Sequence, residues 1–224
     1  DYIVILKIIY KLYMNIYFSI IVSFFFLCFV LMWKRQMQQT EPFGANKKLI
    51  LMGDSIFQNE NYVEEGKSIE ELLQDKAIVV AKDNAKILNA YEQINFIPEN
   101  ENVKTNLIVV SAGGNDLDYI YKDLGKDEDL LNIFTNYKEL IMEIKNKTKP
   151  QIILSTIYYP TSKEYKPYLP IVKEWNKLVI DFANKNNFGI FTLHKYVTKS
   201  SHFTQQIEPS KEGSIIIANK LLEL

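Results

Sequence analysis

The stretch "KLILMGDSIFQN", residues 48–59, sets the fold because an apolar run passes directly into a glycine and two polar residues. A short, nearly continuous apolar run is typical of a strand covered on both faces, as in a parallel sheet. Gly53 allows a tight turn at its end, and Asp54 and Ser55 are residue types favoured at the start of a helix. The stretch therefore predicts a buried strand that turns into a helix-like segment.

Four further runs repeat this apolar pattern along the chain. They are "AIVVA" (77–81), "NLIVVSAG" (106–113), "QIILSTI" (151–157) and "FGIFTL" (188–193). Apolar residues recur every three or four positions in 128–145 and 166–186, which predicts amphipathic helices, and a last helix is expected from about 211 to 222. Strands that alternate with helices indicate an α/β fold around a five-stranded parallel sheet.

The composition describes a globular chain of 224 residues, 47% hydrophobic and 24% charged, with a formal net charge of −1. Near-neutral charge gives no electrostatic reason to expect nucleic acid as a partner. Cys28 is the single cysteine, so an internal disulfide and a cysteine-only zinc site are both excluded. Without clustered histidines and cysteines or a glycine-rich phosphate loop, we expect no metal and no organic cofactor.

Residues 16–33, "IYFSIIVSFFFLCFVLMW", contain no charge. As a helix this run would be roughly 27 Å long, close to the thickness of a bilayer core. No small-x-small cleavage pattern follows Trp33, which favours a retained anchor over a cleaved signal peptide. We therefore expect a single-pass membrane protein, anchored through residues 1–35.

Basic residues flank the apolar run on both sides, so the side of the membrane that carries the rest of the chain stays open. Residues 36–47 are polar, with a proline and a glycine, and are predicted to be a linker. The remaining residues, 48–224, suit one domain of ordinary size.

Three consecutive predicted strands end in residues that could act together. Ligands of such sheets bind beyond the carboxyl ends of the strands. Ser55 follows the first strand, Asn84 the second and Asn115 the third. Alone, each is an ordinary cap or turn residue. Together they supply a nucleophile, a backbone N–H at a turn that tolerates left-handed angles, and an amide donor, which is the set that acyl transfer needs.

These blocks resemble the SGNH or GDSL hydrolases. "GDS" at Gly53, Asp54 and Ser55 matches the first block of the family, and "GGND", with Gly113 and Asn115, matches the third. The resemblance implies a flavodoxin-like three-layer α/β/α sandwich over about residues 48–224.

In the family the serine attacks an ester carbonyl. The serine N–H, the N–H of the second block and the asparagine amide form the oxyanion hole. These roles would pass to Ser55, Asn84 and Asn115. The second block of the family has a glycine where this chain has Asn84, which is a departure.

The last family block, Asp-x-x-His before a helix, is altered here. When "PSKEG" is aligned with it, Glu208 falls at the histidine and Gln205 at the aspartate. The tail resembles a family variant that ends in Ile-Glu-Pro-Ser and has an acidic residue about six positions earlier, where this chain has His202.

Several identities of the general base stay open. His202 is preferred, because an imidazole with a pKa near 6.5 suits neutral pH. Glu208 is the second candidate, and it would need burial to raise its pKa. His194 follows the fifth strand at the correct edge of the sheet. The last possibility is that no base operates.

Two functions follow from these alternatives. The first is a membrane-anchored serine esterase that cleaves a small-molecule ester, of a small acyl group, a sugar or a lipid, through an acyl-enzyme on Ser55. The second is a catalytically impaired binding protein of the same fold at a membrane. Four tyrosines are candidates for lining the cleft: Tyr62, Tyr158, Tyr159 and Tyr165.

Overall fold

The computed structural model describes Val22 and residues 47–117 and 127–224. The predicted anchor therefore lies, apart from Val22, outside the described residues and stays a prediction, as does nearly all of the predicted linker. Within the described parts of the chain, no helix is both long enough and apolar enough to cross a membrane.

A five-stranded sheet is the centre of the described structure. Its strands follow the order β2-β1-β3-β4-β5, and every neighbouring pair is parallel. The strands are β1 (Leu49–Gly53), β2 (Ala77–Val79), β3 (Leu107–Ser111), β4 (Gln151–Ser155) and β5 (Gly189–Phe191). All five predicted strands are confirmed, each shorter than its apolar run. β1 and β3 are buried along their whole length, which explains their continuous apolar sequences.

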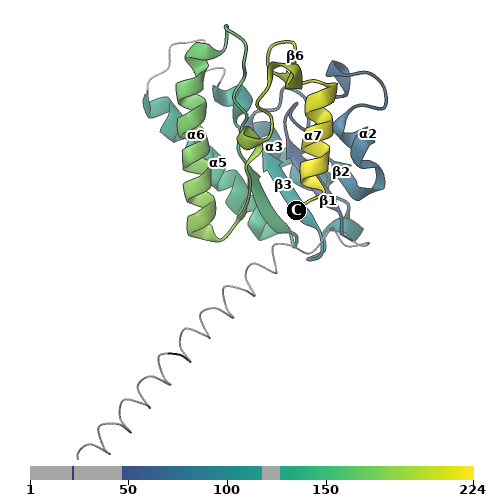
Figure 1. Ribbon diagram of the computed structural model, residues 1–224. Coiled ribbons are helices and arrows are strands. Elements are labelled where there is room, and N and C mark those ends of the chain that lie inside the picture. Colours follow the sequence, from purple (N-terminus) through teal and green to yellow (C-terminus); the bar gives the residue numbers. More distant parts are fainter. Residues whose placement is uncertain (1–21, 23–46, 118–126) are drawn as a thin grey trace, which may run out of the picture. The chain divides into compact units, whose positions relative to one another are not determined.

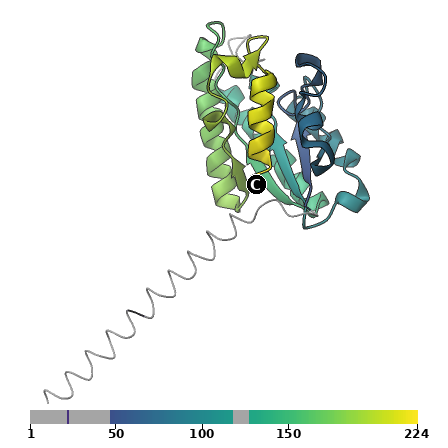
Figure 2. The same ribbon diagram turned by 45° about the vertical axis from the view of Figure 1, so that its right-hand side comes forward.

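Helices cover both faces of the sheet (Figure 1, Figure 2). On one face α2 (Ile69–Leu73) packs against α7 (Lys211–Leu221). On the other, α5 (Asp127–Lys147) packs against both α3 (Ile87–Gln93) and α6 (Leu169–Asn186). The placement of α2 opposite α3, α5 and α6 follows from the strand order. The crossover from β1 to β2 runs along the sheet in the opposite direction to the later crossovers, and right-handed crossovers in opposite directions place their helices on opposite faces. The α/β fold with helical layers around a parallel sheet is confirmed.

The strand order reverses between β1 and β3. The chain leaves β1 toward β2 on one side and returns to β3 on the other. The loops after these two neighbouring strands therefore diverge and leave a crevice between them, which is the usual ligand position in open parallel sheets. Ser55 and Asn115 come from these two loops.

The two long helices agree with their predicted patterns. The 128–145 pattern belongs to α5, and the 166–186 pattern to a short 3₁₀ turn, Lys166–Tyr168, that leads into α6. Proline lies in the first turn of α6, where its missing N–H costs no hydrogen bond. Trp175 of α6 and Tyr137 of α5 are fully buried and meet edge to face, with ring centroids 5.2 Å apart.

The chain between β5 and α7 forms a small hairpin. Its strands, β6 (Phe203–Thr204) and β7 (Glu208–Pro209), pair antiparallel, with Thr204 opposite Glu208. Gln205 and Gln206 between them have positive φ angles of 45° and 73°. The Ser210 N–H donates to the His202 carbonyl at 2.9 Å, which joins the base of the hairpin to the start of α7.

Candidate active site

The turn after β1 holds Ser55 at the edge of the sheet. Gly53 has a φ of 132°, in a region that residues with a Cβ rarely adopt. A Cβ at Gly53 would also collide with the backbone carbonyl of Ser111 in β3. Only glycine therefore lets β1 turn this close to its neighbour and present Ser55, which is 8% exposed, to the crevice.

The Gln93 side chain fixes the peptide groups of Gly53. Its Oε1 accepts from the Gly53 N–H and its Nε2 donates to the Gly53 carbonyl, both at 2.8 Å. Gln93 is fully buried at the end of α3. A side chain from a different element thus holds the turn two residues before Ser55, and no feature of the sequence pointed to it.

Asn84 adopts the left-handed conformation expected for it, with a φ of 60°. Its neighbour Ala85 donates its N–H to the Lys82 carbonyl at 3.1 Å, which closes the turn after β2. Asn84 borders the same crevice as Ser55. The departure from glycine at this position is tolerated because asparagine adopts left-handed angles more readily than most residues.

Asn115 reaches the crevice from the loop after β3. Its Nδ2 donates to the Ala85 carbonyl at 3.0 Å. An amide nitrogen carries two hydrogens, so one hydrogen bond orients the group and the second hydrogen stays available to a ligand. Gly113, with a φ of 107°, lets the loop pass closely over Trp175, whose ring a Cβ would strike.

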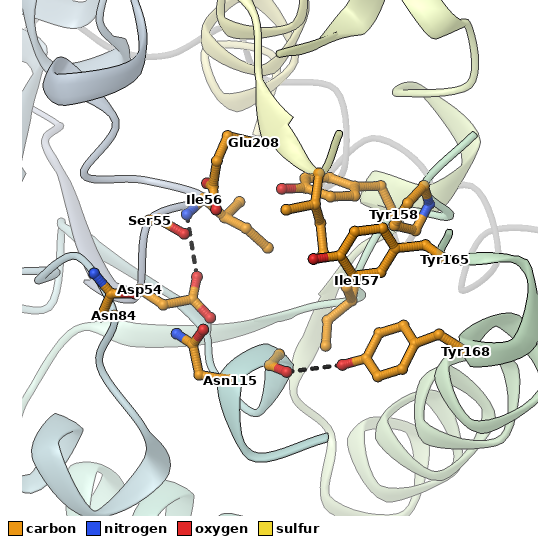
Figure 3. Close-up of a pocket in the computed structure, with 13 residues that line it drawn as sticks. Asp54, Ser55, Ile56, Asn84, Asn115, Ile157, Tyr158, Tyr165, Tyr168 and Glu208 are labelled. Carbon is orange, nitrogen blue, oxygen red and sulfur yellow. Dashed lines mark hydrogen bonds between the residues drawn. The ribbon is translucent and has the colours of Figure 1, made fainter. Parts of the chain in front are cut away.

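A pocket of about 220 Å³ lies between these loops (Figure 3). Asp54, Ser55, Asn84 and Asn115 lie on one side of it, and Glu208 lies above Ser55. The opposite side is built of aromatic and aliphatic groups: Ile157, Tyr158, Tyr165 and Tyr168. The structure therefore brings the three predicted oxyanion residues and Glu208 to one cavity.

Two of the four predicted tyrosines, Tyr158 and Tyr165, line this pocket, while Tyr62 and Tyr159 are not among its lining residues. Tyr62 instead donates from its hydroxyl to the carboxylate of Asp83, at 2.9 and 3.0 Å. Tyr168 lines the pocket without having been predicted, and its hydroxyl donates to the Gly114 carbonyl at 2.8 Å.

Glu208 contacts Ser55 from the hairpin. Burial, the largest effect, raises the pKa of the Glu208 carboxyl, and the nearby Asp83 charge raises it further, while a hydrogen bond from the Ser55 hydroxyl lowers it. Its Oε2 atom is buried and has no hydrogen-bond partner within the described parts of the chain. The carboxylate is thus able to take a proton from Ser55.

His202, the preferred base from sequence, is placed differently. It is 3% exposed, and its Nδ1 accepts from the N–H groups of Thr198 and Lys199, at 3.1 and 3.3 Å. It is not among the residues that line the pocket. The side chain organises the loop before the hairpin, so the geometry favours Glu208 over His202 as the partner of Ser55.

The other two tail candidates also lie outside the pocket lining. His194 makes a 2.8 Å hydrogen bond between its Nδ1 and the Thr156 hydroxyl, at the end of β4. Gln205, which aligns with the family aspartate, is an exposed turn residue of the hairpin. Neither side chain is brought to Ser55.

Asp54 is a second carboxyl in the pocket wall. It is 2% exposed, and its Oδ1 accepts from the Ile56 N–H at 3.1 Å, which shapes the turn around Ser55. Burial, above all, raises its pKa to about 8; the hydrogen bond from Ile56 opposes this, while Glu208 and Asp116 raise it further. Sequence placed Asp54 as a supporting residue but did not show that it would be an acid buried beside another acid.

Comparisons with known proteins show the family of the chain. The family model for GDSL-like lipases and acylhydrolases matches residues 49–221. No match was found among curated proteins.

Solved structures share the fold at low sequence identity. A lipolytic protein of the G-D-S-L family from Veillonella parvula superposes with a TM-score of 0.65 at 17% identity, covering 80% of this chain and 97% of that one. An acetylxylan esterase from Geobacillus stearothermophilus gives 0.59 at 19% identity, covering 81% and 95%. Two forms of that esterase, with an aspartate and a histidine replaced, are described as catalytic mutants.

The family match spans the sheet, the three strand-end loops and the hairpin that carries Glu208. The chain therefore belongs to the GDSL-like lipase/acylhydrolase family of ester-cleaving hydrolases.

Proposed function

We propose that the chain is a serine esterase in which Ser55 is the nucleophile and Glu208 is the general base. The observation that carries this is the contact between the Ser55 hydroxyl and the half-buried Glu208 carboxylate, inside a pocket that also holds Asn84 and Asn115. A nucleophile within hydrogen-bond reach of a base is the signature of covalent catalysis.

The base chemistry is consistent with the environment of Glu208. An unperturbed glutamate has a pKa near 4.3 and is a weak base. Burial raises the pKa of this carboxyl and thereby brings it closer to neutral pH, where a base is more effective. Glu208 takes the proton of the Ser55 hydroxyl as Oγ attacks the ester carbonyl carbon.

The negative charge that develops on the carbonyl oxygen during attack must be stabilised by hydrogen-bond donors. The Ser55 N–H, the Asn84 N–H and the free Nδ2 hydrogen of Asn115 are the donors that we assign to it. The tetrahedral intermediate then collapses, the carbon–oxygen bond to the alcohol breaks, and protonated Glu208 gives its proton to the departing oxygen. Water attacks the acyl-enzyme in the same way, with Glu208 as base, and Ser55 recovers its proton as the acid leaves.

The pocket suits small esters. Its volume of about 220 Å³ is below the usual range of about 300–1,000 Å³ for drug-sized ligands, so a short acyl group fits better than a long chain. Acetylxylan esterases share the fold. Acetylated sugars are accordingly the first substrates to test, with short acyl esters of other alcohols beside them.

We also propose that the enzyme is anchored in a membrane through residues 16–33, with the catalytic domain following a short linker. The support is the charge-free run of 18 residues bounded by Lys34. Resistance of the full chain to alkaline extraction from membranes would support this anchor, and its release into the supernatant would contradict it.

A labelling experiment tests the catalytic proposal. Wild type should react with a fluorophosphonate probe and cleave 4-nitrophenyl acetate, while Ser55→Ala should do neither. Ser200→Ala, which removes the hydroxyl of an exposed serine, is the matched control and should behave as wild type.

Equal labelling of wild type and Ser55→Ala would reject the nucleophile. It would favour the alternative, a binding protein of this fold that no longer turns over. The absence of a histidine from the described pocket lining is the observation behind that alternative.

A further inference from the structure

The carboxyl groups around the pocket have no basic partner in its lining, and Glu208 carries the negative charge because burial raises the pKa of Asp54 to about 8. Asp54 and Glu208 are both in its wall, and none of the thirteen described residues that line it is lysine, arginine or histidine. The lysines after β2 do not compensate: Lys82 lies 4.5 Å from the centre of the Phe96 ring, and Lys86 is exposed outside the lining. A substrate therefore meets acidic groups and no basic one.

This imbalance persists through the reaction that we propose. Before attack, the negative charge is on Glu208. In the transition state the proton is on Glu208 and the charge is on the carbonyl oxygen, so the reacting groups carry one negative charge throughout. In a half-buried site, a fixed charge on the substrate acts on that negative charge with less screening than in water.

The alcohol side of the ester is closest to Glu208. Since Glu208 must hand its proton to the departing alcohol oxygen, the substituent on that oxygen passes beside the carboxyl. Tyr158 is near enough for the Glu208 charge to raise its pKa further, after burial, and it packs edge to face on Phe203 of β6, with ring centroids 5.1 Å apart. Tyr165 and Tyr168 continue this aromatic side (Figure 3).

A carboxylate attracts ammonium groups. Tyr158 and Tyr165 point their hydroxyl oxygens toward the side of the pocket that holds Ser55 and Glu208 (Figure 3), and these oxygens can accept hydrogen bonds or add ion–dipole attraction to the charge of the carboxylate. A carboxylate or phosphate on the substrate would instead face Glu208 with no basic group in the described lining to balance it.

We propose that this pocket selects esters by the charge of the alcohol part, favouring those with an ammonium group near the ester oxygen, then uncharged ones, and disfavouring anionic ones. The inference rests on the proposed function, because it uses Glu208 as the group that protonates the alcohol. It narrows the substrate class from short esters in general to cationic and neutral ones.

Three acetate esters of similar size test the order: acetylcholine, its uncharged isostere 3,3-dimethylbutyl acetate, and 3-acetoxypropanoate. Each kcat/KM is divided by the hydroxide-catalysed rate of the same ester, because an ammonium group also makes the alcohol a better leaving group. We expect a fall of about tenfold or more at each step from cation to neutral ester to anion.

A variant pair checks that the order comes from the pocket. Tyr165→Lys places a cation in the aromatic side and should reverse the preference, whereas Tyr165→Met, similar in length and uncharged, should keep it. Glu60→Gln removes an exposed carboxylate outside the lining and should leave the order unchanged.

Equal corrected rates for the three esters, or a preference for the anion, would overturn the inference while leaving the esterase intact. If Ser55 labels but none of the three esters is cleaved, choline should slow labelling more than 3,3-dimethylbutan-1-ol does, and equal slowing overturns the inference. If Ser55 does not label at all, the proposed function fails, and the charge preference fails with it.

Discussion

The alignment through "PSKEG" predicts that Glu208 replaces the family histidine, and the surroundings of Glu208 differ from those a histidine base would need. A histidine base is usually oriented by a carboxylate, but the residue aligned with that carboxylate, Gln205, turns away at the tip of the hairpin. A carboxylate base has two equivalent oxygens and no tautomer to fix, so it can work without an orienting partner. A chain that uses a glutamate as the base in place of the histidine therefore no longer needs the orienting aspartate.

Replacing Glu208 by glutamine should lower kcat by about 10²- to 10⁴-fold, because the amide cannot accept the serine proton. His202→Asn is the comparison: the asparagine oxygen can still accept the two backbone N–H groups that Nδ1 accepts now. Hydrolysis of 4-nitrophenyl acetate by both variants separates the candidates. A loss of turnover in His202→Asn that matches Glu208→Gln, with the fold intact by circular dichroism, would restore His202 as the base.

Asp54 should make the protein less stable as the pH rises. Its pKa is raised by burial to about 8 in the folded state, whereas an unfolded aspartate titrates near 3.9. Between these values the folded state keeps a proton that the unfolded chain has lost, so the free energy of unfolding falls with increasing pH, by at most about 1.4 kcal/mol per unit.

The isosteric variant Asp54→Asn has no such proton and retains an acceptor for the Ile56 N–H. Its free energy of unfolding, measured in urea from pH 5 to 8, should therefore depend less on pH than that of wild type. Parallel pH dependences would show that Asp54 is ionised in the folded protein.

The sequence predicted three residues that the structure brings to one pocket, but not which of the candidate bases would lie there. Ser55, Asn84 and Asn115 follow strands whose order along the sheet places their ends together, so local sequence was sufficient to find them. The choice between His202 and Glu208 depends on the path of the hairpin, where two glutamines adopt positive φ angles. Glutamine carries no local signal for that conformation, so no pattern could reveal which side chain would face the pocket.

At the scale of elements, the hairpin of β6 and β7 is the device that positions Glu208. The hairpin has only two residue pairs, so its conformation must be fixed mainly by its turn and by its attachment to α7. Gly213 contributes to this attachment, because a Cβ there would collide with the His202 carbonyl. Residues distant from the reaction thus control where the carboxylate lies.

Substitutions of Gln206 should show whether the conformation of the hairpin turn controls the catalytic rate. Its φ of 73° is costly for glutamine, easy for glycine and impossible for proline, whose ring holds φ near −65°. We expect Gln206→Gly to keep kcat and to raise stability by up to about 1 kcal/mol. Gln206→Pro should lower kcat while the melting temperature of the domain changes little. Full activity in Gln206→Pro would show that the hairpin does not position the base.

Most strands and helices could be predicted from the sequence. Buried strands of a parallel sheet have continuous apolar runs, and all five were found at the expected places. Their ends were predicted too long, because the apolar residues after β2 and β4 continue into loops that are still buried. The hairpin was missed altogether, since strands of two residues carry no periodicity.

For the molecule as a whole, the family match and the central sheet begin at the same residue, Leu49. We therefore expect a chain lacking residues 1–43 to fold, to label at Ser55 with the fluorophosphonate probe, and to stay in the supernatant after ultracentrifugation. The full chain should label equally well in the membrane pellet. Partition of both chains into the supernatant would contradict the proposed anchor without affecting the esterase.

Gln93 has a consequence beyond holding one turn. Its amide presents one acceptor and one donor to the two peptide groups of Gly53, as the backbone of a neighbouring strand would. β2 pairs with β1 only as far as Leu51, and beyond it the Gly53 carbonyl accepts both the Lys82 N–H, at 3.1 Å, and the Gln93 side chain. Gln93 therefore adds two side-chain hydrogen bonds to Gly53 at the point where the regular pairing with β2 ends. Gln93→Glu would offer two acceptors in place of an acceptor and a donor. The hydrogen bond to the Gly53 carbonyl would be lost, and the turn that presents Ser55 would be held less firmly.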